Sequence, residues 1–358
     1  MRFCQPSSPI SYMTRVMRIC ICGGGSLGHV CAGFLAAQNV TEVRVFTQHP
    51  ERWNTSLHVT DPNGRVFEGH LDGVSSNPQE VVSECDIILL CLPGFAIEET
   101  LHRIKPHVGQ AAVGSIVCST GFFFAAHRIL GEGVRLFGFQ RTPFIARTTR
   151  YGHAANLLGY KAQIAIAVEN MDDKEAFRQQ VEQLWATPTR LLNSHYEVSL
   201  TNSNPILHTG RLYSLWKDWK GEVYDHNILF YKEWTNEASQ TLIDMDAEFM
   251  QLLTKLPVTP GAIAPLLEYY ESHDAASLTR KITSIAAFQN ITSPMKETEG
   301  GWVPDFESRY FSEDFPFGLR FIYDLSREYG IDTPTINRVY EWGSRVTCDR
   351  RSFPRRAD

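Results

Sequence analysis

The hydrophobic pattern divides the chain into two parts. In the first part, short continuous apolar runs end in glycine, proline or small polar residues; the clearest runs are residues 17–22, 86–92 and 114–118. Such runs are typical of parallel strands buried on both faces of a sheet. In the second part, apolar residues recur at helical spacing, in residues 228–256, 262–271, 275–291, 317–329 and 335–346. The pattern predicts an α/β domain at residues 17–198 and an all-helical domain at residues 199–358.

The first 16 residues precede the first apolar run. They contain two prolines and several serines, and we expect them to form a disordered extension. Met13 and Met17 are both candidate translational starts. The length of 358 residues suits two domains better than a single hydrophobic core.

A glycine-rich turn follows the first predicted strand. Gly23, Gly25 and Gly28 fit the spacing G-x-G-x-x-G, in which the first glycine permits a tight turn, the second lets the backbone approach a pyrophosphate, and the third lets helix pack on strand. A helix that opens at Ser26 or Leu27 would hold the phosphates through its N–H groups and its dipole. The turn predicts a doubly wound, Rossmann-type domain that binds NAD or NADP; the alternative is an ordinary strand–turn–helix connection.

The choice between NAD and NADP is usually made at the end of the second strand, which the pattern places at residues 42–47. An acidic residue there would favour NAD, but the tip of this strand carries none. Thr47, Gln48 and Arg52 are instead suited to receive a 2′-phosphate, and they favour NADP. The alternative is that residues 50–53 simply begin the next helix.

Two further loops are candidates for cofactor contact. Pro93 follows the apolar strand at residues 86–92, and small polar residues with a glycine follow the strand at residues 114–118. Both loops fall at the carboxyl ends of predicted strands, where an open α/β sheet binds its ligand. We therefore expect Pro93 to lie beside the dinucleotide.

The composition is that of an ordinary globular enzyme, with 43% hydrophobic residues, 21% charged residues and a net charge of −6. This mild acidity gives no reason to expect nucleic acid or an anionic membrane as a partner. No apolar run reaches the roughly 18 residues of a membrane span, and the N-terminus lacks the apolar centre of a signal peptide. Most of the 8 cysteines lie in predicted buried elements without a C-x-x-C pair. We expect free thiols, no metal site and a cytoplasmic protein.

The candidate chemistry lies at the predicted domain junction. Asn204 and Pro205 suit the N-cap and the first position of a helix, which places His208 one turn in. An imidazole titrates near neutral pH and can act as proton donor or acceptor. Taken alone, any one of the 12 histidines is more often structural than catalytic.

Two motifs give this histidine a context. Residues 204–208 read N-P-x-x-H, and residues 309–319 read R-Y-x-x-E-D-x-P-x-G-L. Together with the glycine turn, residues 230–233 and residues 330–334, they resemble the octopine and nopaline dehydrogenases, and the resemblance covers nearly the whole chain. It implies an NAD(P)-dependent enzyme with a Rossmann domain followed by a helical domain.

The resemblance also implies roles for single residues. His208 and Asp314 would form a catalytic pair, in which the carboxylate fixes the tautomer of the imidazole and raises its proton affinity. Glu313 is adjacent and remains a competing acid. Arg309 and Asn204 are the implied substrate contacts, with Arg309 suited to hold a carboxylate. Weaker candidates for holding a carboxylate are Arg141, Arg147 and Arg211.

The chain departs from the family pattern after the histidine. Thr209 and Gly210 stand where family members often place a proline, and this glycine would loosen the helix or open space for a different substrate. Tyr231 and Trp234 are compatible with a pocket lining, although aromatic residues at helical spacing more often belong to the core. The substrate therefore stays open.

The implied reaction is a reversible, NAD(P)H-dependent reductive condensation of an α-keto acid with the amine of an amino acid. One alternative is a keto- or hydroxy-acid dehydrogenase of the ketopantoate reductase type, which would use a lysine of the helical domain; Lys217 and Lys220 lie a few turns beyond His208. Another is a catalytically silent protein that senses a dinucleotide. We expect small-molecule partners and a possible homodimer.

Overall fold

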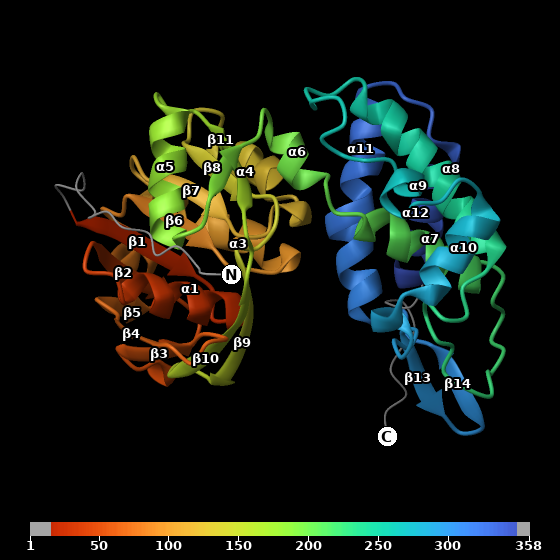
Figure 1. The fold of residues 1–358 in the computed structure, drawn as a ribbon, viewed down its shortest axis with the longest axis horizontal. Coiled ribbons are helices and arrows are strands. Elements are labelled where there is room, and N and C mark those ends of the chain that lie inside the picture. Colours follow the sequence, from red (N-terminus) through yellow and green to blue (C-terminus); the bar gives the residue numbers. More distant parts are fainter. Residues whose placement is uncertain (1–15, 349–358) are drawn as a thin grey trace, which may run out of the picture. The chain divides into compact units, whose positions relative to one another are not determined.

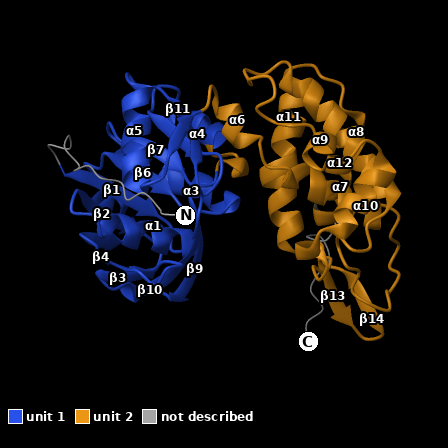
Figure 2. Cartoon of the chain, viewed as in Figure 1, with its two compact units in different colours: residues 1–117, 123–191 blue, residues 118–122, 192–358 orange. Residues whose placement is uncertain are grey.

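A computed structural model describes residues 16–348 (Figure 1). The predicted disordered extension lies outside the described residues, except for Val16. The described chain forms two compact units, one of residues 16–117 and 123–191 and the other of residues 118–122 and 192–348 (Figure 2). The division after residue 191 falls earlier than the predicted boundary at residue 198.

The first unit is built on an eight-stranded sheet. From one edge to the other, its strands follow the order β5-β2-β1-β6-β7-β8-β11-β12. All neighbours are parallel except β11, which runs antiparallel to β8. The first six strands have the doubly wound order of a Rossmann domain. The bounds are β5 Gly73–Ser75, β2 Thr41–Phe46, β1 Met17–Cys22, β6 Ile87–Leu90, β7 Ala112–Ser115, β8 Leu136–Phe139, β11 Ile164–Glu169 and β12 Thr189–Leu191.

Helix α1 (Ser26–Ala36) packs between this sheet and a smaller one. The smaller sheet has the order β4-β3-β10-β9, with bounds β3 Ser56–Thr60, β4 Val66–His70, β9 Phe144–Arg150 and β10 Ala154–Tyr160. Because both faces of α1 are covered, small residues are needed on it. A Cβ atom at Gly33 would lie 2.6 Å from Cγ2 of Val59, and one at Gly69 would lie 2.5 Å from the Gly33 oxygen.

The remaining helices of this unit connect the strands of the large sheet. They are α2 Pro78–Val81, α3 Gly94–Ile104 and α5 Lys174–Trp185, with single turns at η1 Pro50–Arg52 and η2 Lys105–His107. Helix α4 (Phe122–Leu130) follows η3 (Cys118–Thr120), which belongs to the second unit. At the start of α5 the Asp173 carboxylate accepts the N–H of Ala176 at 2.8 Å and caps the helix.

The second unit is mainly helical, as predicted, with α7 (Asn204–Trp216) packed against three other helical segments: α8 Asn236–Leu253, η5 Tyr310–Leu319 and α12 Pro334–Cys348. The other helices are α6 His195–Ser199, α9 Leu266–Tyr269, α10 Ala275–Ser284, η4 Ala286–Phe288 and α11 Arg320–Glu328. The sequence did not predict the hairpin of β13 (Met295–Thr298) and β14 (Gly301–Pro304). Its turn places Gly300 and Gly301 at positive φ.

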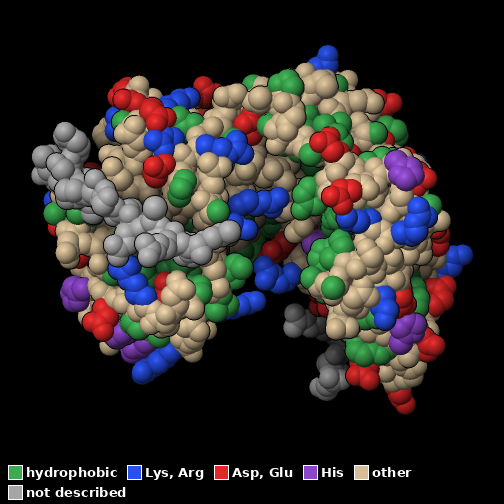
Figure 3. All heavy atoms as spheres, viewed as in Figure 1, with side chains coloured by type: hydrophobic (Ala, Val, Ile, Leu, Met, Phe, Trp, Pro, Cys, Tyr) green, Lys and Arg blue, Asp and Glu red, His purple; other side chains and the backbone are tan. Residues whose placement is uncertain are grey.

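Three predicted helices are shorter than expected: the helix at 262–271 is reduced to α9, the one at 275–291 ends with α10 at Ser284, and the third is the helix that leads into α8. The apolar pattern extended it over 228–256, but α8 begins only at Asn236, where the Thr235 side chain accepts the N–H of Ala238. Residues 228–234 form a bridge and a turn instead. In the described part of the chain, no helix combines the length and the apolar character needed to span a bilayer. Acidic and basic side chains are interspersed on the face shown in Figure 3.

Candidate active site

The glycine turn joins β1 to α1 as predicted. Gly23 has φ +124°, and a Cβ atom there would lie 2.6 Å from the carbonyl oxygen of Cys91. A Cβ atom at Gly28 would lie 2.1 Å from the oxygen of Gly23. A Cβ atom at Gly25, in contrast, would meet nothing within 4 Å. The first and third glycines are thus needed for packing, and the second leaves open space in front of the helix, as a pyrophosphate cradle requires.

A pocket of about 280 Å³ lies at this turn, at the carboxyl ends of β1, β2 and β6. Of the predicted cofactor contacts, it is lined by Gly23, Gly25, Thr47 and Pro93. Ser26, Leu27 and Gly28 form the first turn of α1, whose N–H groups have no acceptor within a helix and suit a phosphate. The side chain of Ser26 is used within the protein, since its Oγ accepts the N–H of Thr148 at 3.0 Å.

The structure changes the identity of the basic residue in this pocket. Arg52 does not line it; its guanidinium lies 4.2 Å from the ring centroid of Tyr151. Arg103 of α3 does line it, lies over the Phe46 ring at 4.7 Å and donates to the carbonyl of Ser76 at 2.6 Å. Arg103 could not be predicted from a local pattern, because α3 approaches the end of β2 only in the folded sheet. The acidic residue described in the lining is Glu99.

His29 also contacts the glycine turn, and it was not identified from the sequence. Its Nδ1 donates to the carbonyl of Gly25 at 2.9 Å, and its Nε2 accepts the N–H of Gly152 at 2.7 Å. The ring is 1% exposed and stacks on Trp53 with centroids 4.2 Å apart. Nε2 can accept a hydrogen bond only in the neutral ring, and burial lowers the pKa of His29 below its usual value.

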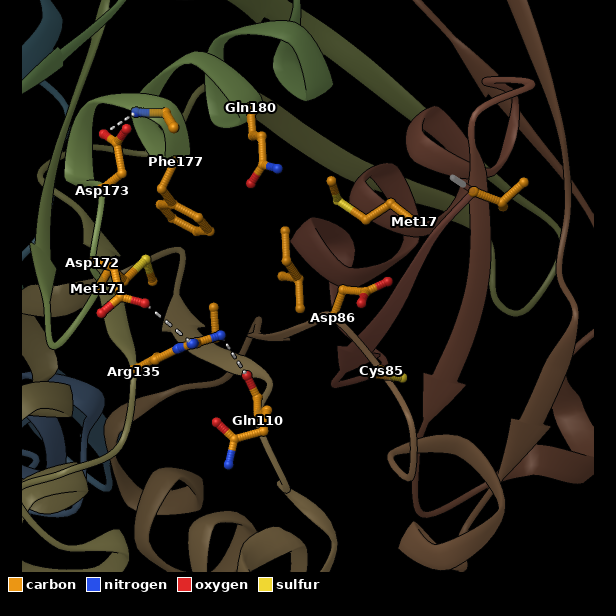
Figure 4. A pocket seen from close by; sticks show the side chains of 14 residues that line it. Met17, Cys85, Asp86, Gln110, Arg135, Met171, Asp172, Asp173, Phe177 and Gln180 are labelled. Carbon is orange, nitrogen blue, oxygen red and sulfur yellow. Dashed lines mark hydrogen bonds and ion pairs between the residues drawn. The ribbon is translucent and has the colours of Figure 1, made fainter. Parts of the chain in front are cut away.

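A larger pocket of about 680 Å³ lies at the opposite ends of the strands, where Met17, Ile87 and Ala112 begin β1, β6 and β7 (Figure 4). Ligands of open α/β sheets bind at the carboxyl ends, so this position does not suit the dinucleotide. Charged side chains in it have structural partners: Arg135 contacts Asp172 at 3.8 Å and the Gln110 carbonyl at 3.4 Å.

The predicted histidine motif opens α7, with one correction. Ser203 occupies the N-cap position, and Asn204 is the first helical residue, so the cap lies one residue earlier than predicted. The N–H of Asn204 donates to Oδ1 of Asn202 at 3.2 Å. Pro205 follows in the first turn, where its missing N–H has no cost. His208 lies one turn into the helix, as expected.

His208 and Asp314 meet as the family resemblance implied. Nδ1 of His208 lies 2.8 Å from Oδ2 of Asp314, which belongs to η5, and the two side chains are 14% and 22% exposed. A carboxylate only accepts, so Nδ1 carries the proton and Nε2 of the neutral ring is the acceptor. At Nε2 the hydroxyl of Tyr231 lies 3.0 Å away. Tyr231 therefore belongs to the site, whereas Trp234 donates to Ser239 within the core.

The competing acid has a different partner. Glu313 accepts two hydrogen bonds of 2.9 Å from Arg309, at Nε and Nη2, which identifies Asp314 as the partner of the imidazole. These bonds raise the pKa of Arg309, whose side chain is 81% exposed. The guanidinium has the geometry to hold a carboxylate, but in this structure it holds the one on Glu313.

The glycine after the motif does not have the expected effect. Helix α7 continues through Thr209 and Gly210 to Trp216 without a break. A Cβ atom at Gly210 would lie 2.8 Å from Cδ1 of Leu242 and 3.1 Å from Sδ of Met245, both on α8. Gly210 therefore permits the close approach of α8, and it neither loosens the helix nor widens a substrate space.

The three weaker arginine candidates differ in burial and in their partners. Arg141 and Arg147 belong to the first unit and are exposed. Arg211 is on α7 but is only 1% exposed, and it donates to the backbone carbonyls of Phe230 and Glu233 at 3.0 and 2.8 Å. A buried guanidinium bonded to backbone has a structural position. Among the described residues, His, Cys, Asp and Glu side chains do not gather in groups of three or more that could hold a metal ion.

Comparisons with known proteins agree with this geometry. A family profile described as the alpha-helical domain of NAD/NADP octopine/nopaline dehydrogenase matches residues 191–347, and one described as ketopantoate reductase PanE/ApbA matches residues 19–119. A tauropine dehydrogenase of Arabella iricolor is 29% identical over 361 residues, which cover 91% of this chain and 90% of that protein.

Solved structures show the same fold. An octopine dehydrogenase solved with NADH and L-arginine has a TM-score of 0.82 at 24% identity, covering 92% of this chain and 89% of that one. A yersinopine dehydrogenase solved with NADP⁺ has a TM-score of 0.68 at 13% identity, covering 94% of this chain and 93% of that one.

Fold and site together define an NAD(P)-dependent dehydrogenase in which a Rossmann domain is followed by a helical domain with its own histidine–carboxylate pair. The helical-domain profile spans both His208 and Asp314, and the glycine turn lies within the second matched region. The helical part of the chain matches the octopine/nopaline dehydrogenase family, and the similarity to a tauropine dehydrogenase extends over 91% of the chain. The resemblance and the fold class predicted from the sequence are confirmed.

Proposed function

We propose that this protein catalyses the reversible, NAD(P)H-dependent reductive condensation of an α-keto acid with the amino group of an amino acid. The observation that carries the proposal is the hydrogen-bonded pair of His208 and Asp314 at 2.8 Å. It lies in the segment that matches the octopine/nopaline helical domain, and the similarity to a tauropine dehydrogenase extends over most of the chain.

The pair suits the proton transfers of this reaction. When an amine adds to a keto carbon, the resulting hydroxyl must leave as water before the C=N bond is reduced. His208 would give the proton to that leaving hydroxyl and would take one back in the reverse direction. Asp314 occupies Nδ1, so the exchange takes place at Nε2. The nicotinamide, when bound, supplies or accepts the hydride.

We assign substrate contacts to Arg309 and Asn204. Arg309 presents a planar fork that already binds the carboxylate of Glu313, so a substrate carboxylate would bind by exchange with it. Asn204 lies at the start of α7, one turn before His208, and its amide can donate to a second carboxylate oxygen.

We assign dinucleotide binding to the unit with the glycine turn, through Gly23, Gly25, Ser26, Leu27 and Gly28, with Thr47 and Pro93 in the pocket wall. NADP(H) is the favoured cofactor. Arg103 brings a positive charge to the pocket, and no acidic residue of the β2 tip is in its lining. Arg52 is instead stacked on Tyr151.

A matrix of keto acids and amino acids, assayed with NADH and with NADPH, tests the function. Oxidation of the reduced cofactor should require both substrates together. Turnover of a keto acid alone would favour a hydroxy-acid dehydrogenase of the ketopantoate reductase type. That alternative needs an available lysine, and Lys217 is 2.9 Å from Glu237 and 3.6 Å from Asp218. Tight cofactor binding without turnover across the matrix would indicate a dinucleotide sensor.

His208→Gln provides the matched control for this assay. The variant should lose amine-dependent turnover by about 10²–10⁴-fold, because the proton donor is gone. Its affinity for NADPH, measured by fluorescence titration, should stay within about twofold, since the glycine turn belongs to the other unit. Retained turnover in this variant would remove His208 from the mechanism.

A further inference from the structure

Tyr231 occupies the atom of His208 at which proton exchange must take place. Its hydroxyl lies 3.0 Å from Nε2, and the Tyr231 side chain is almost fully buried. The ring is held by a stacked contact with Phe288, with centroids 4.3 Å apart. Burial raises the pKa of the Tyr231 phenol, so the group stays protonated at neutral pH and donates its O–H to the neutral imidazole.

The turn that carries Tyr231 is anchored from α7. Arg211 follows His208 by three positions and lies on the same side of the helix. Its Nε donates to the carbonyl of Phe230 at 3.0 Å, and its Nη2 donates to the carbonyl of Glu233 at 2.8 Å. These two carbonyls stand on either side of Tyr231 in the chain. One helix therefore carries the imidazole and also fixes the group that bonds it.

The bond from Tyr231 has a defined effect on protonation. The hydroxyl can donate to Nε2 only while this nitrogen is unprotonated, so the bond favours the neutral ring. Asp314 acts in the opposite sense, because its carboxylate favours the protonated ring. Among residues 16–348, the titratable groups in contact with His208 are Asp314 and Tyr310 from η5 and Tyr231 from the turn. Arg211 follows three positions later on its own helix and donates to the Phe230 carbonyl.

We propose that Tyr231, anchored by Arg211, is a positioning residue that opposes Asp314 and sets the pH range in which His208 can exchange its proton. Because Nε2 has one site for a hydrogen bond, the substrate must displace this hydroxyl before it reaches the imidazole. While it is bound there, the Tyr231 hydroxyl holds the ring in the neutral state, which can accept a proton. Once it leaves, Nε2 can take up the proton that His208 gives to the leaving hydroxyl in the condensation direction. The proposal rests on the proposed function for its catalytic meaning, but its effect on His208 is independent of turnover.

Tyr231→Phe in the full-length chain tests this directly. The C–H resonances of histidine rings, with His208 assigned from the His208→Gln variant, report its titration by NMR without any substrate. The midpoint of the His208 titration should move up by about half to one pH unit, which corresponds to the loss of one hydrogen bond to the neutral ring. In the assay, the pH limb that depends on His208 should move in the same direction.

Tyr310→Phe is the matched control. The Tyr310 ring also packs on His208, with centroids 4.9 Å apart, but in the described part of the chain no hydrogen bond joins the two side chains. In this variant the midpoint of the His208 titration should stay within about 0.2 pH units of that in the unmodified protein, because no hydrogen bond to the imidazole is lost. Arg211→Lys, which keeps the charge and loses the fork, should give a smaller upward shift.

An unchanged or lowered midpoint in folded Tyr231→Phe would overturn the proposal, as would an equal shift in Tyr310→Phe. Folding is checked by circular dichroism and thermal unfolding of each variant. If amine-dependent turnover is never found while the NMR midpoint moves as expected, the proposed function fails and the positioning role stands.

Discussion

Oδ2 of Asp314 lies 2.8 Å from Nδ1 of His208 although 106 positions separate the two residues in the sequence. The pair depends on the close packing of η5 against α7. At this contact Gly318 lies beside Pro205, where a Cβ atom would be 2.9 Å from Cγ of the proline ring. The geometry of the acid–base pair therefore depends on the close approach of two other residues, Gly318 and Pro205.

Asp314→Asn should lower kcat by about 10²–10⁴-fold, because an amide no longer favours the protonated imidazole and is compatible with the wrong tautomer. The measurement is steady-state kinetics with the best pair of substrates from the matrix. Glu313→Gln is the control, since Glu313 bonds Arg309 and not His208, and its kcat should change by less than about threefold on that basis. Equal losses in the two variants would contradict the assignment of Asp314.

Gly318→Ala should separate η5 from α7. Alanine normally stabilises a helical position, but here the added methyl overlaps the Pro205 ring and should cost about 1–3 kcal/mol of unfolding free energy. Thermal or denaturant unfolding measures the cost, and kcat should fall with it because Asp314 moves away from His208. Gly133→Ala is a suitable control, since a Cβ atom there would meet nothing within 4 Å. A Gly318→Ala protein as stable and active as the parent would contradict this account.

The parts of the fold that could be predicted from the sequence are those with a local signal. The strand–glycine–helix turn at Gly23 is one, because φ and spacing are encoded in adjacent residues. The pairing of His208 with Asp314 came from motifs and not from periodicity. The turn around Tyr231 was assigned to a long helix, since its apolar residues continue the helical spacing of α8.

The differences between the predicted and the observed side-chain positions at the site have a common physical cause. The sequence shows that Arg52 follows β2 but not that its guanidinium stacks on Tyr151, nor that Arg103 reaches the pocket from α3. Likewise, it shows a glycine at position 210 but not the helix that packs on it. Which side chain faces a site is decided by tertiary packing, and a single sequence carries little information about it.

Arg309 is predicted to release the carboxylate of Glu313 and to bind a substrate carboxylate in its place. Arg309→Met should raise KM for a carboxylate substrate about tenfold or more, because a charge-assisted fork is lost. Its effect on stability should be small, within about 0.5 kcal/mol, since the ion pair with Glu313 is largely exposed on the arginine side. Glu313→Gln should leave KM unchanged or lower it by removing the competitor. A higher KM in Glu313→Gln would indicate that the pair acts as a unit.

His29 should make the first unit sensitive to acid. Burial lowers its pKa in the folded state, so below the unfolded value of about 6.5 the unfolded chain binds a proton that the folded chain does not. Stability should therefore be full above this pH and should decline as the pH falls, by up to about 1.4 kcal/mol per unit. Unfolding curves between pH 8 and 5 should have a shallower pH slope in His29→Gln. A His29→Gln protein with the parent slope would contradict this account.

The choice of cofactor should depend on Arg103. If this guanidinium receives the 2′-phosphate, Arg103→Ala should weaken NADPH binding by about 10- to 100-fold through the loss of charge-assisted hydrogen bonds, with a much smaller effect on NADH. Fluorescence titration of each reduced cofactor gives the two Kd values. Arg52→Ala is the matched control, because Arg52 is not in the pocket lining and its guanidinium lies on the ring of Tyr151, which is. This variant should change neither Kd by more than about twofold. If Arg52→Ala selectively weakened NADPH binding and Arg103→Ala did not, Arg52 would again be the residue expected to receive the 2′-phosphate. Equal losses of both cofactors in Arg103→Ala would place this residue against the adenosine they share, and would leave Thr47 and Gln48 at the β2 tip as the remaining candidates for discrimination.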